Sequence, residues 1–199
     1  MADDKQGRDK QAHDAERRQR ERELRTELER RDEAEPPVTD EELDELEAAL
    51  EDVSFPATGA EVVAAVGDRT VTAGTDRYAV RSLLPDSDVE TFPRREVVRV
   101  RVRRPTVAAA MKQIVEAAGT IPNGEFPATT RDVFEKSLRA MAAIDADDED
   151  SGVRALRDWI LDRIEENGEL PRSRDVRRQG SKIAREYGYD VRSDDWLGI

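Results

Sequence analysis

A four-residue turn that opens a helix occurs twice in this chain and constrains its fold more than any other feature. The copies are Phe55-Pro56-Ala57-Thr58 and Phe126-Pro127-Ala128-Thr129. The threonine that ends each copy stands three residues before an acid, Glu61 or Asp132, which is the spacing of a helix cap and a first-turn carboxylate. A shortened third copy predicts another helix start, with Ser173 as its cap. The chain is therefore expected to consist mainly of helices.

Apolar residues recur three or four positions apart in further stretches, which indicates helices with one buried face. Helices are predicted within residues 39–53, 58–66, 105–118, 126–144, 153–167 and 173–187. Residues 69–80 predict a β-hairpin that turns at Ala73-Gly74-Thr75-Asp76. Residues 91–104 are ambiguous, because valines alternate with arginines at strand period, whereas Thr91-Phe92-Pro93 resembles the helix-opening turns. We favour a helix there.

Composition along the chain predicts three parts and a mainly α fold with a small β-hairpin, an α+β arrangement. Residues 1–35 are almost entirely charged or small and predict a helical or disordered tail that ends at Pro36-Pro37. Residues 36–118 predict a small α+β domain that contains the hairpin, and residues 119–199 predict a helical domain with a possible helix-turn-helix.

The charge balance points to a particular environment. The net charge is −13, charged residues make up 40% of the chain, and lysine occurs only at positions 5, 10, 112, 136 and 182. An acid excess with scarce lysine is typical of cytoplasmic proteins of salt-loving organisms, and the alternative is an ordinary acidic protein from a GC-rich genome. Cysteine is absent, and no apolar run approaches the ~20 residues of a membrane span. We expect a soluble, cytoplasmic protein without a membrane partner.

Motifs for catalysis, metals and cofactors fail at specific positions. Residues 119–125 have the glycine spacing of a phosphate loop, but Glu125 stands where the lysine belongs. The acids of 145–150 resemble a calcium loop, but Asp150 replaces its glycine. His13, the single histidine, has no partner for a catalytic or metal site. We therefore expect no catalytic residues, no metal, no cofactor and no enzyme activity.

Two basic stretches stand out in so acidic a chain. The first consists of Arg94, Arg95, Arg99, Arg101, Arg103, Arg104 and Lys112. The second consists of Arg172, Arg174, Arg177, Arg178, Lys182 and Arg185. The second lies where residues 156–176 resemble the opening helices of winged-helix repressors, so its cations are candidates for nucleic-acid contacts. The alternative is internal pairing with the acids Asp158, Asp162, Glu165 and Glu166.

Several motifs together resemble uncharacterised proteins of halophilic archaea. They are the charged N-terminal segment, the Phe-Pro-Ala-Thr openings, Arg-Arg-Pro-Thr-Val-Ala-Ala-Ala at 103–110, Arg-Glu-Tyr-Gly-Tyr-Asp-Val at 185–191 and Asp-Asp-Trp-Leu-Gly at 194–198. The resemblance covers most of the chain. It implies the saline environment and the fold class, and it carries no activity or site residues to transfer.

Two functional hypotheses follow from these features. In the first, a non-catalytic protein binds nucleic acid, with a regulatory role, through the cations of residues 172–185. In the second, an adaptor or structural factor contacts a partner protein through the charged N-terminal segment and the apolar Trp196-Leu197 end.

Overall fold

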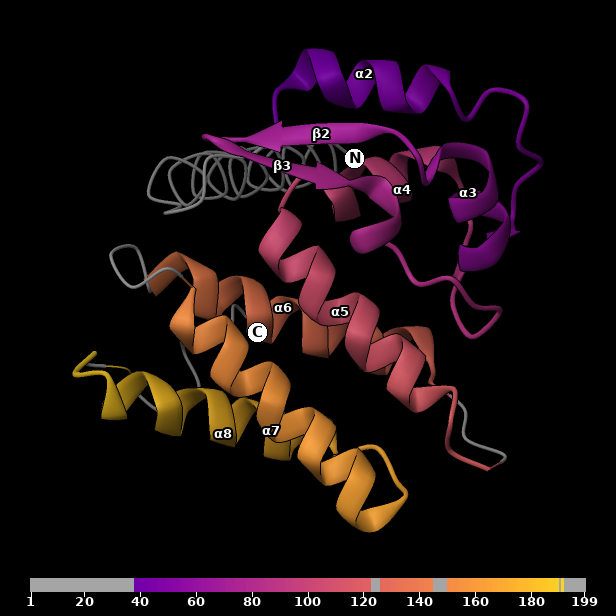
Figure 1. Cartoon of the computed structure of the whole chain (residues 1–199). Coiled ribbons are helices and arrows are strands. Elements are labelled where there is room, and N and C mark those ends of the chain that lie inside the picture. The colour runs from indigo at the N-terminus through magenta and orange to yellow at the C-terminus, as the bar shows by residue number, and fades with distance from the viewer. Residues whose placement is uncertain (1–37, 123–125, 145–149, 190, 192–199) are drawn as a thin grey trace, which may run out of the picture. The chain divides into compact units, whose positions relative to one another are not determined.

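The computed structural model of this chain describes residues 38–122, 126–144, 150–189 and 191 (Figure 1). Three predictions fall outside them: those on the charged segment with His13, on the acids 145–149 and on the Trp196-Leu197 end.

Helices dominate the described residues, accompanied by two pairs of short antiparallel strands, which confirms the predicted fold class. In chain order the elements are α2 (Asp40–Ala48), β1 (Ala57–Thr58), α3 (Gly59–Val66), β2 (Thr70–Ala73), β3 (Asp76–Ala79), the 3-10 turn η1 (Val80–Ser82), β4 (Thr91–Phe92), α4 (Arg95–Val102), α5 (Pro105–Ala118), α6 (Ala128–Ile144), α7 (Ser151–Asn167) and α8 (Ser173–Glu186). Within the described ranges, none of these helices combines the length and the apolar character needed to cross a bilayer.

The caps of α2 and α3 are formed by side chains, as the sequence predicts. Thr39 Oγ1 accepts a hydrogen bond from the backbone N–H of Glu42 at 3.3 Å. Thr58 Oγ1 accepts from the N–H of Glu61 at 3.3 Å, while the Glu61 carboxylate accepts from the N–H of Thr58 at 2.7 Å. This reciprocal arrangement satisfies donors that the first turn of a helix leaves open.

The first turn of α3 packs tightly against the loop that leads to β4. The N–H of Gly59 donates to the carbonyl oxygen of Glu90 at 2.9 Å. A Cβ atom at Gly59 would lie 2.3 Å from the carbonyl oxygen of Pro85, closer than any real contact of this kind. The position therefore accepts only glycine without a shift of the backbone.

The other two predicted caps are wrong. Helix α6 begins at Ala128, and the N–H groups of Thr130 and Arg131 donate to the Pro127 carbonyl oxygen at 2.9 and 3.0 Å, so the threonine after Ala128 lies inside the first turn. Helix α8 begins at Ser173 itself. In the first Phe-Pro-Ala-Thr copy, the alanine and the threonine form strand β1, which pairs with β4. The backbone therefore remains extended up to the threonine, and the helix begins after it. The second copy is already helical from its alanine, so its helix starts earlier in the same tetrapeptide.

The predicted hairpin is confirmed and contacts α2. Strands β2 and β3 are antiparallel, with Val71 opposite Tyr78 and Ala73 opposite Asp76. Gly74 has φ 60°, a left-handed conformation that glycine adopts without steric cost. The N–H of Thr72 donates to the Glu42 carboxylate on α2 at 3.1 Å. This hydrogen bond ties the hairpin to the first described helix.

The ambiguous segment 91–104 forms a helix after a two-residue strand. Val98 and Val102 are fully buried on one face of α4, whereas Val100 is 47% exposed on the opposite face. Four-residue spacing places the first two valines on the same side of a helix. The helical interpretation is therefore confirmed, and the valine–arginine alternation does not mark a strand.

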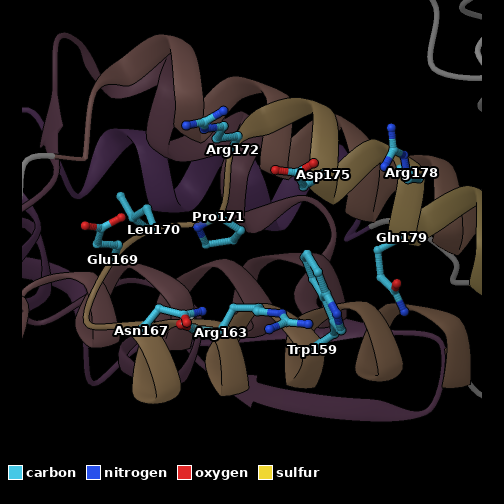
Figure 2. A pocket seen from close by; sticks show the side chains of 10 residues that line it. All are labelled: Trp159, Arg163, Asn167, Glu169, Leu170, Pro171, Arg172, Asp175, Arg178 and Gln179. Carbon is cyan, nitrogen blue, oxygen red and sulfur yellow. Dashed lines mark hydrogen bonds between the residues drawn. The ribbon is translucent and has the colours of Figure 1, made fainter.

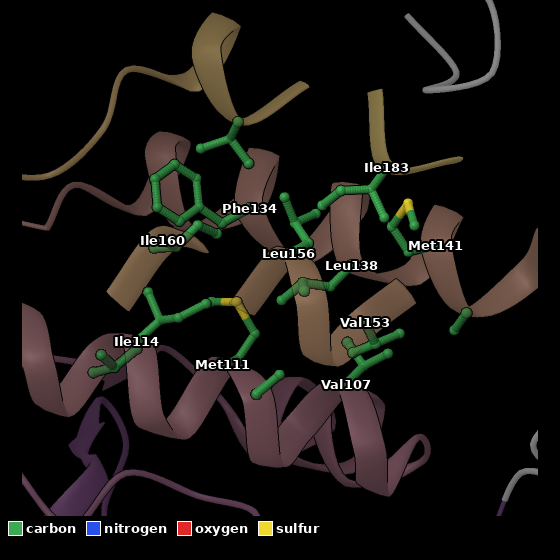
Figure 3. Close-up of a cluster of buried hydrophobic side chains, with 14 of the residues drawn as sticks. Val107, Met111, Ile114, Phe134, Leu138, Met141, Val153, Leu156, Ile160 and Ile183 are labelled. Atoms are coloured by element: carbon green, nitrogen blue, oxygen red, sulfur yellow. The ribbon is translucent and has the colours of Figure 1, made fainter. Parts of the chain in front are cut away.

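Two clusters of buried side chains form the core, and α5 contributes to both. Side chains of α5, α6, α7 and α8 meet in the larger cluster, among them Met111, Phe134, Leu156 and Ile183 (Figure 3). The smaller cluster gathers residues of α2, the strands, α3 and α4, and it includes Ala108 on α5. Helix α5 therefore connects the region of the hairpin with the C-terminal helices.

Candidate nucleic-acid interface

The first basic stretch is largely engaged by acids of the same chain. Arg99 on α4 lies 3.1 Å from Asp40 and 3.6 Å from Glu47, both on α2. It also forms an ion pair with Asp44. Burial by itself lowers the pKa of Arg99, but the three acids, Asp44 foremost, outweigh this effect and raise the pKa above its ordinary value. These contacts hold α4 against α2 and leave little of this charge for a ligand.

Arg101 lies at the centre of a buried ionic cluster. Its side chain is 6% exposed and donates hydrogen bonds to both carboxylate oxygens of Glu90, at 2.8 and 3.2 Å. Its guanidinium also lies 3.0 Å from the carboxylate of Glu135 on α6. Burial alone lowers the pKa of Arg101, but Glu135 and Glu90 outweigh it and the pKa is raised. Loss of one partner in such a cluster costs roughly 3–5 kcal/mol, so Arg101 has a structural role.

Two arginines of α6 complete this cluster. Arg131 lies 3.6 Å from Glu90, and Arg139 forms an ion pair with Glu135. Burial lowers the pKa of Arg139 and outweighs the attraction of Glu135, while neighbouring arginines add to the lowering. The cluster joins α4, the loop before β4 and α6 through charge, next to the apolar contacts of α5.

The second basic stretch lies on α8 and at its N-terminal boundary. Arg172 occupies the N-cap position, and the other five predicted residues belong to the helix. Arg177 is partly buried, whereas the side chains of Arg172, Arg174, Arg178, Lys182 and Arg185 are exposed. The structure therefore brings all six candidates to one helix, and five of them reach solvent.

Four of these cations share one face of α8, which we call the cationic stripe: Arg174, Arg178, Lys182 and Arg185. Their spacings of four, four and three residues place them on one side of a helix. The stripe extends over about 16 Å, because each residue adds ~1.5 Å along the axis. The opposite face, with Val176 and Ile183, is buried against the larger cluster. Burial thus orients the stripe outward.

Ion pairs on the stripe are few and exposed. Arg174 lies 3.8 Å from Asp175, and Lys182 lies 3.7 Å from Glu186. Within the described residues, Arg178 and Arg185 form neither an ion pair nor a hydrogen bond. Exposed pairs of this type contribute ~0–1 kcal/mol, so an anionic ligand can displace them at little cost.

Two of the four α7 acids that were candidates for internal pairing, Asp158 and Glu166, pair with arginines of their own helix. Asp158 accepts a hydrogen bond from Arg157 Nε at 2.8 Å, and Glu166 lies 3.2 Å from Arg163. Among the described residues, no acid of α7 pairs with a cation of α8. The contacts that would neutralise the stripe from α7 are therefore not made there.

The helix, tight turn and helix of the C-terminal region are present as α7, residues 168–172 and α8. Helix α7 ends at Asn167 and is followed by Gly168, whose φ of 64° suits a left-handed cap. Helix α8 then continues unbroken through Val176 to Glu186. A winged-helix order would require a turn shortly after Val176, and α8 has none. The described geometry is a helical hairpin whose second helix carries the cations.

A groove of about 630 Å³ opens between α7, the connecting residues and α8. Trp159 and Arg163 line it from α7, and Asp175 and Arg178 lie across it on α8 (Figure 2). The guanidinium carbon of Arg163 lies 5.6 Å from the centre of the Trp159 ring, within the range of a cation–π contact. From the sequence, Trp159 is predicted only to lie on the inward face of its helix. The four-residue spacing between Trp159 and Arg163 is the signal that could have revealed their cation–π contact.

Carboxylates do not assemble into a metal site in the part of the chain that the structure describes. No group of three or more histidine, cysteine, aspartate or glutamate residues there has a geometry that could hold a metal ion.

The chain is similar to a family of proteins over part of its length. Residues 37–114 match the model of a family of unknown function, DUF5789. Neither a curated protein nor a solved structure matches the chain. The match includes the hairpin, α4 and part of α5, and it ends before the helices that carry the stripe and the groove. The candidate interface therefore has to be judged from its own chemistry.

Proposed function

We propose that this protein binds nucleic acid without catalysing a reaction, through the cationic stripe of α8. The observation that carries the proposal is that Arg174, Arg178, Lys182 and Arg185 line one exposed face in a chain of net charge −13. The field of so acidic a chain repels a polyanion at long range, so binding needs a local surface of opposite sign. Contacts from arginine and lysine to phosphate oxygens supply most of the affinity in such complexes.

The two remaining candidates flank the stripe. Arg172 precedes the first turn of α8, and Arg177 is partly buried on the side of the helix next to the stripe. In the proposed complex the four stripe residues contact phosphates. Arg172 and Arg177 lie at the edges of the stripe and attract the nucleic acid towards it. Contacts of this kind bind without strong sequence preference, which suits a regulatory protein that acts on many sites.

We also propose that the protein works in the cytoplasm of a halophilic archaeon. The acid excess and the scarcity of lysine support this environment. At ~1 M salt the screening length falls to about 3 Å. Long-range attraction between the protein and the phosphates is then weak, so binding depends on direct contact. The exposed side chains of the cationic stripe allow such contact.

Fluorescence anisotropy of the full chain with a labelled oligonucleotide, measured across a range of KCl concentrations, tests the proposal. Replacement of the four stripe residues by serine is expected to weaken binding about 100-fold or more at low salt. With about four phosphate contacts, the logarithm of affinity of the natural chain should fall with the logarithm of salt at a slope of roughly −3 to −4. The slope of the variant should approach zero.

The matched control replaces four exposed arginines elsewhere, Arg69, Arg77, Arg94 and Arg154, by serine. The change in net charge is the same, so this variant should retain binding within a few-fold. Equal losses in both variants would show that net charge alone governs binding. Absence of binding by the natural chain contradicts the proposal directly.

The adaptor hypothesis rests on the charged N-terminal segment and Trp196-Leu197, which lie outside the described residues. Affinity purification at native salt, with and without nuclease, distinguishes it from nucleic-acid binding. Nucleic acid recovered only with an intact stripe supports the proposal. A stoichiometric partner that resists nuclease, with no nucleic acid recovered, overturns it in favour of an adaptor.

A further inference from the structure

We propose that the groove between α7 and α8 holds an unpaired nucleobase, so that the nucleic acid recognised is single-stranded. The inference rests on the proposed function and names the class of ligand that the same surface takes. The groove is continuous with the cationic stripe, because Arg178 belongs to both. A strand whose phosphates follow the stripe therefore has beside it a groove large enough to admit a base.

The groove offers a stacking platform. Trp159 projects from α7 into the groove, with the Arg163 guanidinium against its ring (Figure 2). Unpaired bases stack on aromatic rings and on guanidinium planes. A base within a duplex is already stacked on both faces and cannot enter a groove of this kind without being extruded.

The rim of the groove supplies both phosphate and base-edge contacts. Arg172 and Arg178 stand on the α8 side, where the backbone of the strand would pass. Gln179 and Asn167 present amide groups, and the Asn167 amide nitrogen already donates to the Arg163 carbonyl oxygen at 3.1 Å. The oxygen of that amide is an acceptor for a base amine. Asp175 would repel a phosphate but accept from an amine.

The lining of the groove favours a base over an acidic peptide. The volume of about 630 Å³ lies within the range of roughly 300–1,000 Å³ that holds small organic groups. An acidic peptide would use the arginines but would leave the ring of Trp159 without a flat partner. A base with its phosphate uses the ring and the cations together.

Tryptophan fluorescence of the full chain provides the test. The chain contains two tryptophans, so the Trp196→Phe variant reports on Trp159 alone. Addition of a twelve-nucleotide thymidine strand is expected to quench this emission, and a duplex of the same length should not. Anisotropy should give at least tenfold tighter binding of the strand than of the duplex.

Two variants separate stacking from charge. Trp159→Ala is expected to weaken strand binding by about tenfold or more, as the loss of one stacked base does, while leaving the weak duplex binding unchanged. Arg163→Gln removes the guanidinium from the ring with little loss of packing, and it should weaken strand binding several-fold even if the alanine variant is unstable. Tyr187→Ala, an exposed aromatic residue that follows α8 outside the groove lining, is the matched control and should bind as the natural chain does.

The outcomes distinguish this inference from the proposed function. Equal binding of strand and duplex, unaffected by either groove variant but lost with the stripe, overturns the inference and leaves the proposed function intact. Absence of binding to both nucleic acids overturns both. Quenching of Trp159 by an acidic peptide, with none by the thymidine strand, also overturns the inference.

Discussion

Thr58 and Thr129 end identical tetrapeptides, yet their side chains serve different purposes. Thr58 closes a reciprocal cap with Glu61 at the start of α3. Thr129 lies in the first turn of α6, after Ala128 has already entered the helix. A cap stabilises a helix by satisfying a first-turn N–H, whereas a threonine inside the helix only loses side-chain rotamer freedom, because it is β-branched.

Thr58→Ala is therefore expected to lower the free energy of unfolding by ~1 kcal/mol. Thr129→Ala should change it by less than ~0.5 kcal/mol or raise it slightly, because alanine is the better helix former. Urea denaturation followed by circular dichroism measures both. Equal losses from the two substitutions would contradict the different roles that we assign to them.

The contact that gives Thr58 and Thr129 different roles cannot be predicted from the neighbouring sequence. Thr58 faces Thr91 across a two-residue strand pair, and 33 positions separate them in the sequence. The role of Arg101 is likewise not predictable from its neighbours in the sequence. It belongs to a run of alternating valines and arginines, but it is buried against Glu90 and Glu135. The residue types are visible in the sequence, whereas their partners are fixed only by the fold.

At the scale of elements, α4 decides between two periodicities. As a helix it buries Val98 and Val102 and exposes Val100. As a strand it would place all three valines on one face. The arginines fit the helix as well, because Arg99 contacts α2 and Arg101 contacts α6. Residues two positions apart point to different sides in a helix, whereas in a strand they point to the same side.

Substitution of single valines in α4 tests this assignment. Val98→Ala should lower the free energy of unfolding by roughly 2 kcal/mol, because it removes fully buried methyl groups. Val100→Ala should change it by less than ~0.5 kcal/mol, because its side chain is half exposed. Guanidinium denaturation gives both values, and similar losses would indicate a strand-like environment instead.

Local signals predict most of the element boundaries. Pro105 begins α5, and Gly168 follows the end of α7, because each residue suits the backbone at that end of a helix. The start of α8 is predicted one residue late, and the strands β1 and β4 are not predicted at all. Two-residue strands leave too short a pattern to be recognised. The six cations of the candidate site are predicted, whereas the groove, which needs α7 and α8 side by side, is not.

At the scale of the whole molecule, the net charge of −13 opposes folding through self-repulsion. Salt screens exposed charges, and the screening length falls from about 10 Å at 0.1 M to about 3 Å at 1 M. The buried contacts of Arg101 are screened much less, because solvent ions do not reach them. Stability should therefore increase with salt.

Thermal unfolding in KCl measures this effect. Between 0.1 and 1 M we expect Tm to rise by more than ~3 °C, which corresponds to about 1 kcal/mol for a chain of this size. The stripe variant carries four fewer positive charges, so its net charge is −17 instead of −13, and its Tm should rise more steeply. A Tm that is constant or falls with salt would show that self-repulsion between the acids does not limit the stability of the fold.

The end of the family match has a consequence for how this protein can be divided. Residue 114 lies inside α5, and Ile114 and Met111 pack against helices that follow the matched segment (Figure 3). Glu135, which contacts Arg101, also lies beyond it. The stretch shared with the family is thus not a module that can be cut out here, because a cut at its border would divide a helix and separate a buried charge from its counter-ion.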